Sequence, residues 1–436
     1  MLLPLHGIAS RHDMPLPLPF VVLGAAAALV ISFAVLGLAW RRPRFAQVGG
    51  ISLPRLTRLV DHPATRTVTR VAVALLYLWA GLALALGRDL LTNPVFGFVF
   101  VWVWVGLVPA SLLLGPFWRA TNPLRTLHHG LCALARTDPS EGVLSLPRGI
   151  GVWPAAVGIY GFAWLELVQP ERTTLPVLRV WVLAWLVLGV LGAVLFGSRW
   201  IGAADPLEAY ATTVAQLSPW RRVDGELRLV NPLAGLNAWR PPPGSAAVVA
   251  ALLGSTAFDS FANTSWWIQT VQASPAPTVL WGTGGLLVLT LVVLVTFWAA
   301  AAWMGRYGDR PASAYPGRMA GSLVPIVIGY AVAHYFTLLV VEGQRTAINF
   351  SDPLSRGWDV FGSAEMGVRT SLFEHPTAIA VVQLLAIVTG HVVGVVVAHE
   401  KAVSLLPSGS ALRGQWPMLA VMVGYTCAGL VLLFSP

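Results

Sequence analysis

The sequence predicts an all-α integral membrane protein, a polytopic bundle of about ten transmembrane helices that forms a single domain over residues 1–436. The first observation is composition, because 56% of the residues are apolar, only 11% are charged and the mean hydropathy is +0.70. Soluble domains carry roughly 25% charged residues, so a soluble enzyme and a disordered chain are both excluded. The second is that the basic residues gather between the apolar runs. The net charge of +9 therefore predicts membrane orientation rather than a nucleic-acid partner.

The third observation is the set of apolar runs, each close to the roughly 20 residues that a helix needs to cross a bilayer. They cover residues 18–39, 71–87, 95–115, 151–168, 175–197, 246–265, 278–303, 319–341, 377–399 and 416–434. The first run has no basic segment before it and is followed by Arg41 and Arg42, so we expect it to remain as a span rather than to be cleaved.

The distribution of basic residues predicts the orientation of these spans. With the N-terminus outside, 21 of the 28 basic residues fall in inner loops and 7 in outer ones. The positive-inside bias therefore places both termini outside. Arginine supplies 27 of the 28, which is typical of a GC-rich bacterial genome. We expect a multi-pass protein of the bacterial cytoplasmic (inner) membrane, with the lipid bilayer as its main partner.

A segment repeats about 83 residues apart. Asn122-Pro123-Leu124 follows the third predicted span, and Asp205-Pro206-Leu207 follows the fifth. An Asn or Asp followed by Pro is typical of a helix N-cap and first turn. Leucines at helical spacing after Pro123 predict a helix along the inner surface. The parallel repeat, span, inner loop and span, covers approximately residues 95–168 and 178–265. It fits a structural duplication, or a frame around a substrate site.

Ionisable residues inside spans are costly and so indicate candidate sites. Asp259 lies in the outer half of the sixth span, where it can face a water-filled cavity, bind a cation or pair with a neighbouring helix. His334 lies in the eighth span, and Glu342 follows it by eight residues, about 80° around a helix. The two can therefore border one cavity.

Histidines elsewhere extend this set. His391 follows Gly390 in a Gly390–Gly394 pair that lets another helix approach closely, so it is a packing residue, a ligand or a proton carrier. His399 fits an interfacial residue, and the His128–His129 pair a solvated face. His6 and His12 precede the first span. A long outer loop, residues 342–376, adds carboxylates, and imidazoles with carboxylates suit zinc or another first-row metal.

Several segments together resemble a family of polytopic bacterial membrane proteins labelled fenitrothion hydrolase. They are His6–Asp13, Gly106–Pro116, Trp118–His128, Ala333–Phe336, Glu342–Gln344, Ser351–Pro353, Arg356–Asp359, Gly390–His391, Ala398–His399, Gln415–Met418 and Gly424–Thr426. The resemblance runs over most of the chain. It implies hydrolysis of an aryl phosphotriester with release of a nitrophenol.

Three functions fit these residues. In a metal-dependent hydrolase with an outward-facing cavity, a metal-bound water is the nucleophile. Its ligands are His6, His12, His334 and His391, and the ligand or general base is Asp259 or Glu342. In a carrier for a metal ion or small solute, the same groups line the path of the solute. In a structural or assembly protein they serve helix packing.

Overall fold

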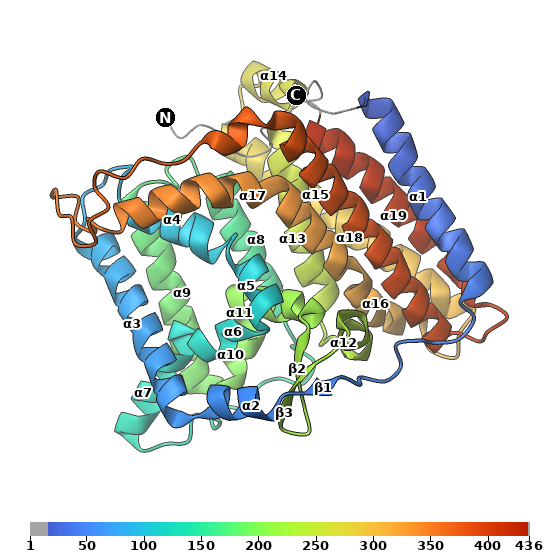
Figure 1. The fold of residues 1–436 in the computed structure, drawn as a ribbon, viewed down its shortest axis with the longest axis horizontal. Coiled ribbons are helices and arrows are strands. Elements are labelled where there is room, and N and C mark those ends of the chain that lie inside the picture. Colours follow the sequence, from blue (N-terminus) through green and yellow to red (C-terminus); the bar gives the residue numbers. More distant parts are fainter. Residues whose placement is uncertain (1–15, 435–436) are drawn as a thin grey trace.

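A computed structural model describes residues 16–434, which fold into a bundle of long helices (Figure 1). The long helices are α1 (Leu18–Ala39), α3 (Pro63–Leu86), α8 (Trp153–Leu167), α9 (Leu175–Phe196), α13 (Ser245–Ala262), α15 (Thr278–Trp303), α17 (Val324–Asn349), α18 (Pro376–Leu405) and α19 (Ala411–Phe434). The predicted all-α class is confirmed.

Shorter elements connect these helices. The α-helices are α2 (Pro54–Asp61), α4 (Pro94–Gly97), α5 (Leu107–Leu114), α6 (Phe117–Thr121), α7 (Pro123–Ala135), α10 (Arg199–Ala204), α11 (Pro206–Val214), α12 (Pro232–Ala238), α14 (Ser265–Ala273) and α16 (Tyr315–Met319). One π-helix, η1 (Phe98–Val103), joins α4 to α5. The 3₁₀ turns are η2 (Ala215–Leu217), η3 (Met304–Arg306), η4 (Ala312–Ala314), η5 (Ala320–Leu323) and η6 (Ser371–Glu374). A small antiparallel sheet has the order β1 (Ile51–Ser52), β3 (Glu226–Leu229), β2 (Trp220–Val223).

The protein is a membrane protein by the length and apolarity of its helices. Within residues 16–434, eight helices are long and apolar enough to cross a bilayer, and nine if the bent pair α4–η1 and α5 counts as one span. At fifteen residues, α8 is shorter than the length this criterion requires. The predicted count of ten spans is therefore not confirmed. Large apolar side chains are exposed along α1, α3, α9 and α15, which suits contact with lipid.

The third predicted span is bent by 47° rather than continuous. At the end of η1, the amide of Trp104 donates to Val99 O at 3.1 Å, and the amide of Gly106 donates to Val101 O at 2.9 Å. Both are five-residue steps of a π-helix, which is frequent at functional sites. Pro109 lacks an amide hydrogen, so it cannot donate the helical hydrogen bond to the carbonyl of Val105, four residues earlier. The bend brings η1 against α17.

Proline placed after a polar cap starts several of these helices. Asn93, Asn122, Asp205 and Asn231 each accept a hydrogen bond from the second amide after them, and proline occupies the first helical position. Proline's missing amide costs nothing at that position, because it would be unpaired there anyway. The two caps predicted in the repeated segment, Asn122 and Asp205, are confirmed.

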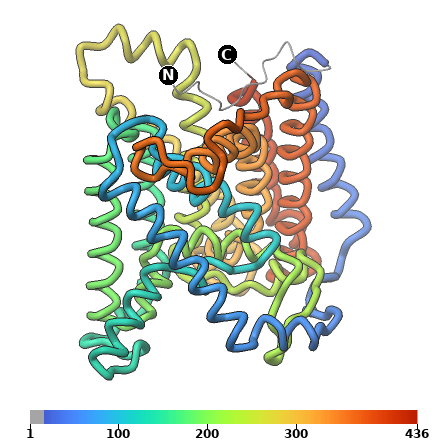
Figure 2. Tube along the Cα trace, turned by 60° about the vertical axis from the view of Figure 1, so that its left-hand side comes forward, coloured from blue at the N-terminus to red at the C-terminus, as the bar shows by residue number. Residues whose placement is uncertain are grey.

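The C-terminal helices form one tightly packed group, with α1 lying beside α18 and α19 (Figure 2). A Cβ added at Gly390 of α18 would lie 2.7 Å from Pro325 O of α17, and one at Gly394 would lie 2.9 Å from Ser322 O. The close helix approach predicted from this glycine pair is confirmed. It fixes the position of α17, which carries His334.

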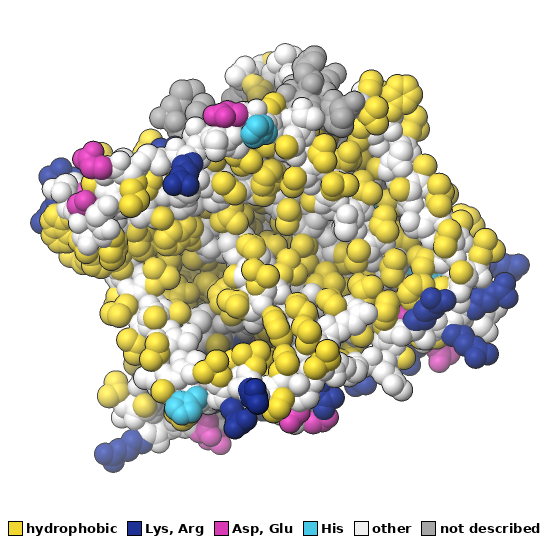
Figure 3. Space-filling model, viewed as in Figure 1, with side chains coloured by type: hydrophobic (Ala, Val, Ile, Leu, Met, Phe, Trp, Pro, Cys, Tyr) yellow, Lys and Arg dark blue, Asp and Glu magenta, His cyan; other side chains and the backbone are white. Residues whose placement is uncertain are grey.

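Apolar and basic side chains separate on the surface. In Figure 3 the hydrophobic side chains cover the middle of the molecule, and Lys and Arg lie mostly along the lower edge, near α2, α7 and the loop after α1. We call this lower surface the basic face. The opposite end carries α4, α14 and the C-terminal end of α17 (Figure 1).

Candidate functional site

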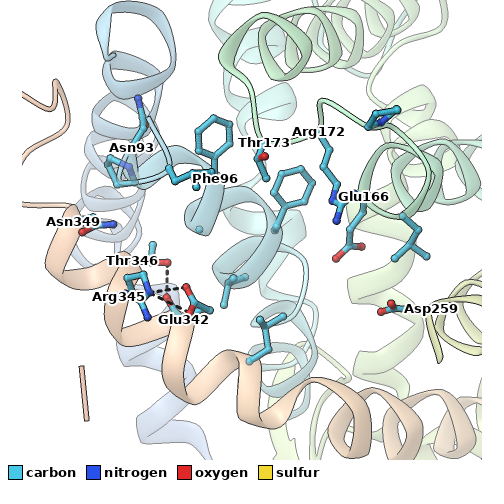
Figure 4. Close-up of a pocket in the computed structure, with 18 of the residues that line it drawn as sticks. Asn93, Phe96, Glu166, Arg172, Thr173, Asp259, Glu342, Arg345, Thr346 and Asn349 are labelled. Carbon is cyan, nitrogen blue, oxygen red and sulfur yellow. Dashed lines mark hydrogen bonds and ion pairs between the residues drawn. The ribbon is translucent and has the colours of Figure 1, made fainter. Parts of the chain in front are cut away.

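A cavity of about 600 Å³ lies at the end of the bundle opposite the basic face, a size typical of sites for small organic ligands (Figure 4). Its wall combines apolar side chains of α4 and η1 with charged ones from α8, α13, α17 and the loop after α8. The charged and amide-bearing lining residues are Asn93, Glu166, Arg172, Asp259, Asn263, Glu342, Arg345 and Asn349.

Asp259 and His334 are brought together by the packing of α13 against α17. His334 Nε2 lies 2.9 Å from Asp259 Oδ2, and the Tyr335 hydroxyl donates to the same oxygen at 3.1 Å. On the other side of the ring, His334 Nδ1 lies 3.3 Å from Ser260 Oγ, which is itself 3.3 Å from the Tyr330 hydroxyl. All five side chains are buried. They form a continuous hydrogen-bonded line, with Asp259 at its cavity end.

Glu342 lines the same cavity as Asp259 but is paired with Arg345 rather than with His334. Arg345 Nε donates to both of its carboxylate oxygens, at 3.1 Å and 3.0 Å. Figure 4 shows this pair on the far side of the cavity from Asp259. Glu342 belongs to α17, which continues to Asn349, so the outer loop predicted to begin at residue 342 begins eight residues later. The structure thus brings Glu342 to the cavity wall on a rigid helix.

Glu166 is a site residue that the sequence analysis missed. It lies on α8, is 8% exposed and lines the cavity. Among the described residues its carboxylate has no hydrogen bond or ion pair. In Figure 4 it points into the cavity between Arg172 and Asp259. The available signal was simple, since Glu166 is the one acidic or basic residue of the apolar run 151–168.

His391 does not join this site. Gln383 Nε2 of α18 donates to Ala333 O of α17 at 2.9 Å, so His334 and Gln383 lie at about the same height in the bundle. His391 follows Gln383 by eight residues, which places it about 12 Å further along α18. Its Nδ1 donates to Ile387 O at 2.9 Å, and its buried Nε2 has no partner within the described chain. The structure therefore separates two of the histidines predicted as ligands of one metal.

The metal prediction gains no support from the arrangement of donors. Between residues 16 and 434 no three His, Cys, Asp or Glu side chains come together in a way that can hold a metal ion. His6 and His12 lie outside the described residues. The metal therefore stays a prediction.

His128 is buried rather than solvated, contrary to the sequence interpretation. Its Nε2 lies 3.4 Å from Cys132 Sγ, and its Nδ1 lies 3.2 Å from Ser198 Oγ. Burial, followed by the nearby charges of His129 and Arg125, lowers the pKa of His128. The ring is therefore neutral at physiological pH, and it joins α7 to the start of α10.

The cavity offers three carboxylates, Glu166, Asp259 and Glu342, against two guanidinium groups, Arg172 and Arg345, so its lining carries an excess of acid. Such a wall can bind a positively charged group or exchange protons with a bound solute. Comparison with protein-family models, curated proteins and solved structures gave no match for this chain.

Proposed function

We propose that the protein is a membrane carrier for a small organic cation, which binds in the cavity between α8, α13 and α17. The observation that carries this proposal is the Glu166 carboxylate, which lines the cavity and has no partner among the described residues. A carboxylate in a largely dehydrated wall costs several kcal/mol unless a counter-charge compensates it. Arg172 lies on the same wall but forms no ion pair with Glu166, so a cationic solute supplies the direct counter-charge.

The size of the cavity favours an organic solute over a bare metal ion. A divalent ion needs several oxygen or nitrogen ligands within about 2–2.6 Å. The cavity measures about 600 Å³, and Glu342 and Asp259 occupy opposite sides of it (Figure 4). Aromatic side chains of Phe96 and Phe100 line the same space and suit the apolar part of an organic cation.

The bent span supports transport. Discontinuous helices line the substrate sites of many secondary transporters, since their unwound carbonyls and free helix ends can face the solute and its coupling ions. Here Phe96 and Gly97 of α4 and Phe100 of η1 belong to the bent pair and line the cavity.

The proposal includes a topology of ten spans, with α8 and the bent pair each crossing the membrane. The basic face lies in the cytoplasm of a bacterial cell, and both termini and the cavity lie outside. The parallel repeat is supported by contacts between its equivalent positions. Asn122 Nδ2 donates to Asp205 Oδ2 at 2.8 Å, and Arg125 Nη2 donates to Glu208 Oε1 at 2.6 Å. Each contact joins residues 83 apart.

Uptake by sealed vesicles tests the carrier. Purified protein reconstituted in proteoliposomes is assayed with radiolabelled tetraethylammonium, competed by a panel of unlabelled primary and quaternary amines. We expect saturable uptake that falls at least ten-fold in Glu166→Gln and in Asp259→Asn.

The matched control is Glu171→Gln, which removes an exposed acid from the adjacent loop outside the cavity. It should transport like the wild type. Wild-type vesicles that take up no more cation than empty ones, and that show no competition by any amine, would contradict the proposal.

A hydrolase is the second candidate, and one observation favours it beyond the family resemblance. The line Asp259–His334–Ser260 has the order carboxylate, imidazole, hydroxyl, in which the imidazole can act as general base. The substrate test is nitrophenol release from an aryl phosphotriester by the purified protein, with and without chelator. His334→Ala should abolish turnover, and Ser260→Ala separates a serine nucleophile from activation of water. If metal-replete wild-type protein releases no nitrophenol, the carrier is the one candidate function that remains.

A further inference from the structure

A second cavity, of about 450 Å³, is lined by elements that lie towards the basic face in Figure 1. It lies between α6, α10 and α11, with the start of α13 as a further wall. Its lining includes three arginines, Arg119, Arg125 and Arg199, against one acid, Glu208. Neither the carrier nor the hydrolase uses this cavity.

The charges in this cavity are not balanced. Glu208 is fully engaged by Arg125, whose Nε and Nη2 donate to its two oxygens at 2.7 Å and 2.6 Å. This bidentate pair is largely buried. Arg119 and Arg199 have no acidic partner within residues 16–434, so the cavity keeps a net charge of +2 from its arginines and Glu208.

The remaining lining groups suit an oxyanion. Thr212 and Ser245 bring hydroxyls to the wall. Ser245 also begins α13, a helix of eighteen residues whose first turn adds partial positive charge. Planar guanidinium groups bind the paired oxygens of a phosphate or carboxylate bidentately, a geometry that a halide cannot use.

The cavity also lies where the two halves of the repeated segment meet. Arg119 and Arg125 come from the first copy, and Arg199 and Glu208 come from the second. Sites at the interface between structural repeats are common in transporters.

We propose that this cavity is a binding site for a phosphate-class oxyanion, either free phosphate or the phosphate of an anionic lipid headgroup, held by Arg119 and Arg199. The site does not depend on the function proposed for the outer cavity.

Two measurements on the purified full-length protein distinguish the sources. Inorganic phosphate is titrated in detergent at constant ionic strength, and the shift in apparent Tm is compared with that from chloride. Native mass spectrometry then compares retention of phosphatidylglycerol and phosphatidylcholine. Stabilisation by phosphate supports a free ion, and selective retention of phosphatidylglycerol supports the headgroup.

The variants are Arg119→Gln with Arg199→Gln, and the same pair changed to lysine. Both arginines are exposed, so neither change should impair folding. We expect at least ten-fold weaker binding in the glutamine pair and an intermediate loss in the lysine pair, which keeps charge but not the planar fork. Arg148→Gln removes an exposed charge outside the cavity and should bind like the wild type. Absence of both signals in the wild type, or equal loss in Arg148→Gln, would overturn the proposal.

Discussion

At the scale of single residues, buried polar groups hold distant segments together. Glu400 of α18 accepts hydrogen bonds from Trp40 Nε1 at 2.9 Å and from the Phe45 amide at 2.7 Å, across about 360 residues of sequence. The neighbouring His399 Nε2 donates to Trp40 O at 2.8 Å. The sequence analysis expected His399 to lie at the membrane–water interface. Its burial was not predictable, because its partner is a backbone carbonyl from the far end of the chain.

Replacing Glu400 by alanine should destabilise the protein substantially. The change leaves the Trp40 indole and the amides of Arg44 and Phe45 without their acceptor, and each buried unpaired group costs about 1–3 kcal/mol. We expect the apparent Tm in detergent to fall by several degrees. The control, Glu365→Ala, removes an exposed acid and should leave the apparent Tm unchanged. If the two variants have the same apparent Tm, the hydrogen bonds of Glu400 to the loop after α1 do not stabilise the fold.

The candidate site shows how far single residues can be read from sequence. Asp259 and His334 stood out because charge or imidazole inside an apolar run is costly, and the structure pairs them. Glu166 met the same criterion and was overlooked. The pairing of Glu342 with Arg345 follows from a three-residue helical step, but only once α17 is known to continue past residue 341.

At the scale of elements, hydrophobic length predicted the long helices, and the short helices after Asn122 and Asp205 were predicted from their caps. Each of the ten apolar runs overlaps a helix, since roughly twenty apolar residues leave few alternatives. The bend in the third run depends on the π-helical step at Trp104, which periodicity does not reveal. The sheet pairs Ile51 with Leu229, and such a long-range register leaves no local signal.

The link between α2 and the sheet should depend on pH. Asp61 ends α2 and pairs with Arg222 of β2 and Arg66 of α3. Hydrogen bonds from Arg222 and then Arg66 lower the pKa of Asp61 from 3.8 to about 2. Because this folded-state pKa is depressed, the pair stabilises fully above about pH 4, and the contribution is lost as the pH falls towards 2.

Hydrogen exchange of α2, corrected for the chemical rate at each pH, measures this link. Asp61→Asn should exchange faster than the wild type at pH 7, with the difference shrinking below pH 4. Asp224→Asn removes a much more exposed acid, 3.7 Å from Arg228, and should exchange as the wild type. A difference that persists unchanged at pH 2 would exclude Asp61 ionisation as the cause.

At the scale of the whole molecule, charge separates the two ends. The basic face holds the cavity of the three arginines, and the opposite end holds the cavity of Glu166, Asp259 and Glu342. The count of basic residues per loop predicted this separation from sequence, because loop charge is a local property. A cavity was expected near Asp259 and Glu342, but its full lining and the second cavity were not predictable, since each draws its walls from helices far apart in the chain.

Cysteine labelling in intact cells tests the proposed orientation. After replacement of the two free cysteines, Cys132 and Cys427, single cysteines are placed at Arg148 on the basic face and at Glu365 at the other end. A membrane-impermeant maleimide should label position 365 in whole cells and position 148 only after permeabilisation. Labelling in the reverse order would invert the proposed topology.

The contacts between Asn122 and Asp205 and between Arg125 and Glu208 bear on how such a chain arose. Under the proposed repeat, an ancestor with one copy would pair through the same positions about a two-fold axis, so each residue would face its own duplicate. Two asparagines can satisfy each other in that arrangement, whereas two arginines or two glutamates repel. Under the proposed repeat, the opposite charges at 125 and 208 therefore require that the sequences of the two copies have diverged. A symmetric dimer of identical chains cannot place an arginine and a glutamate at equivalent positions, so this buried ion pair depends on the difference between the two copies.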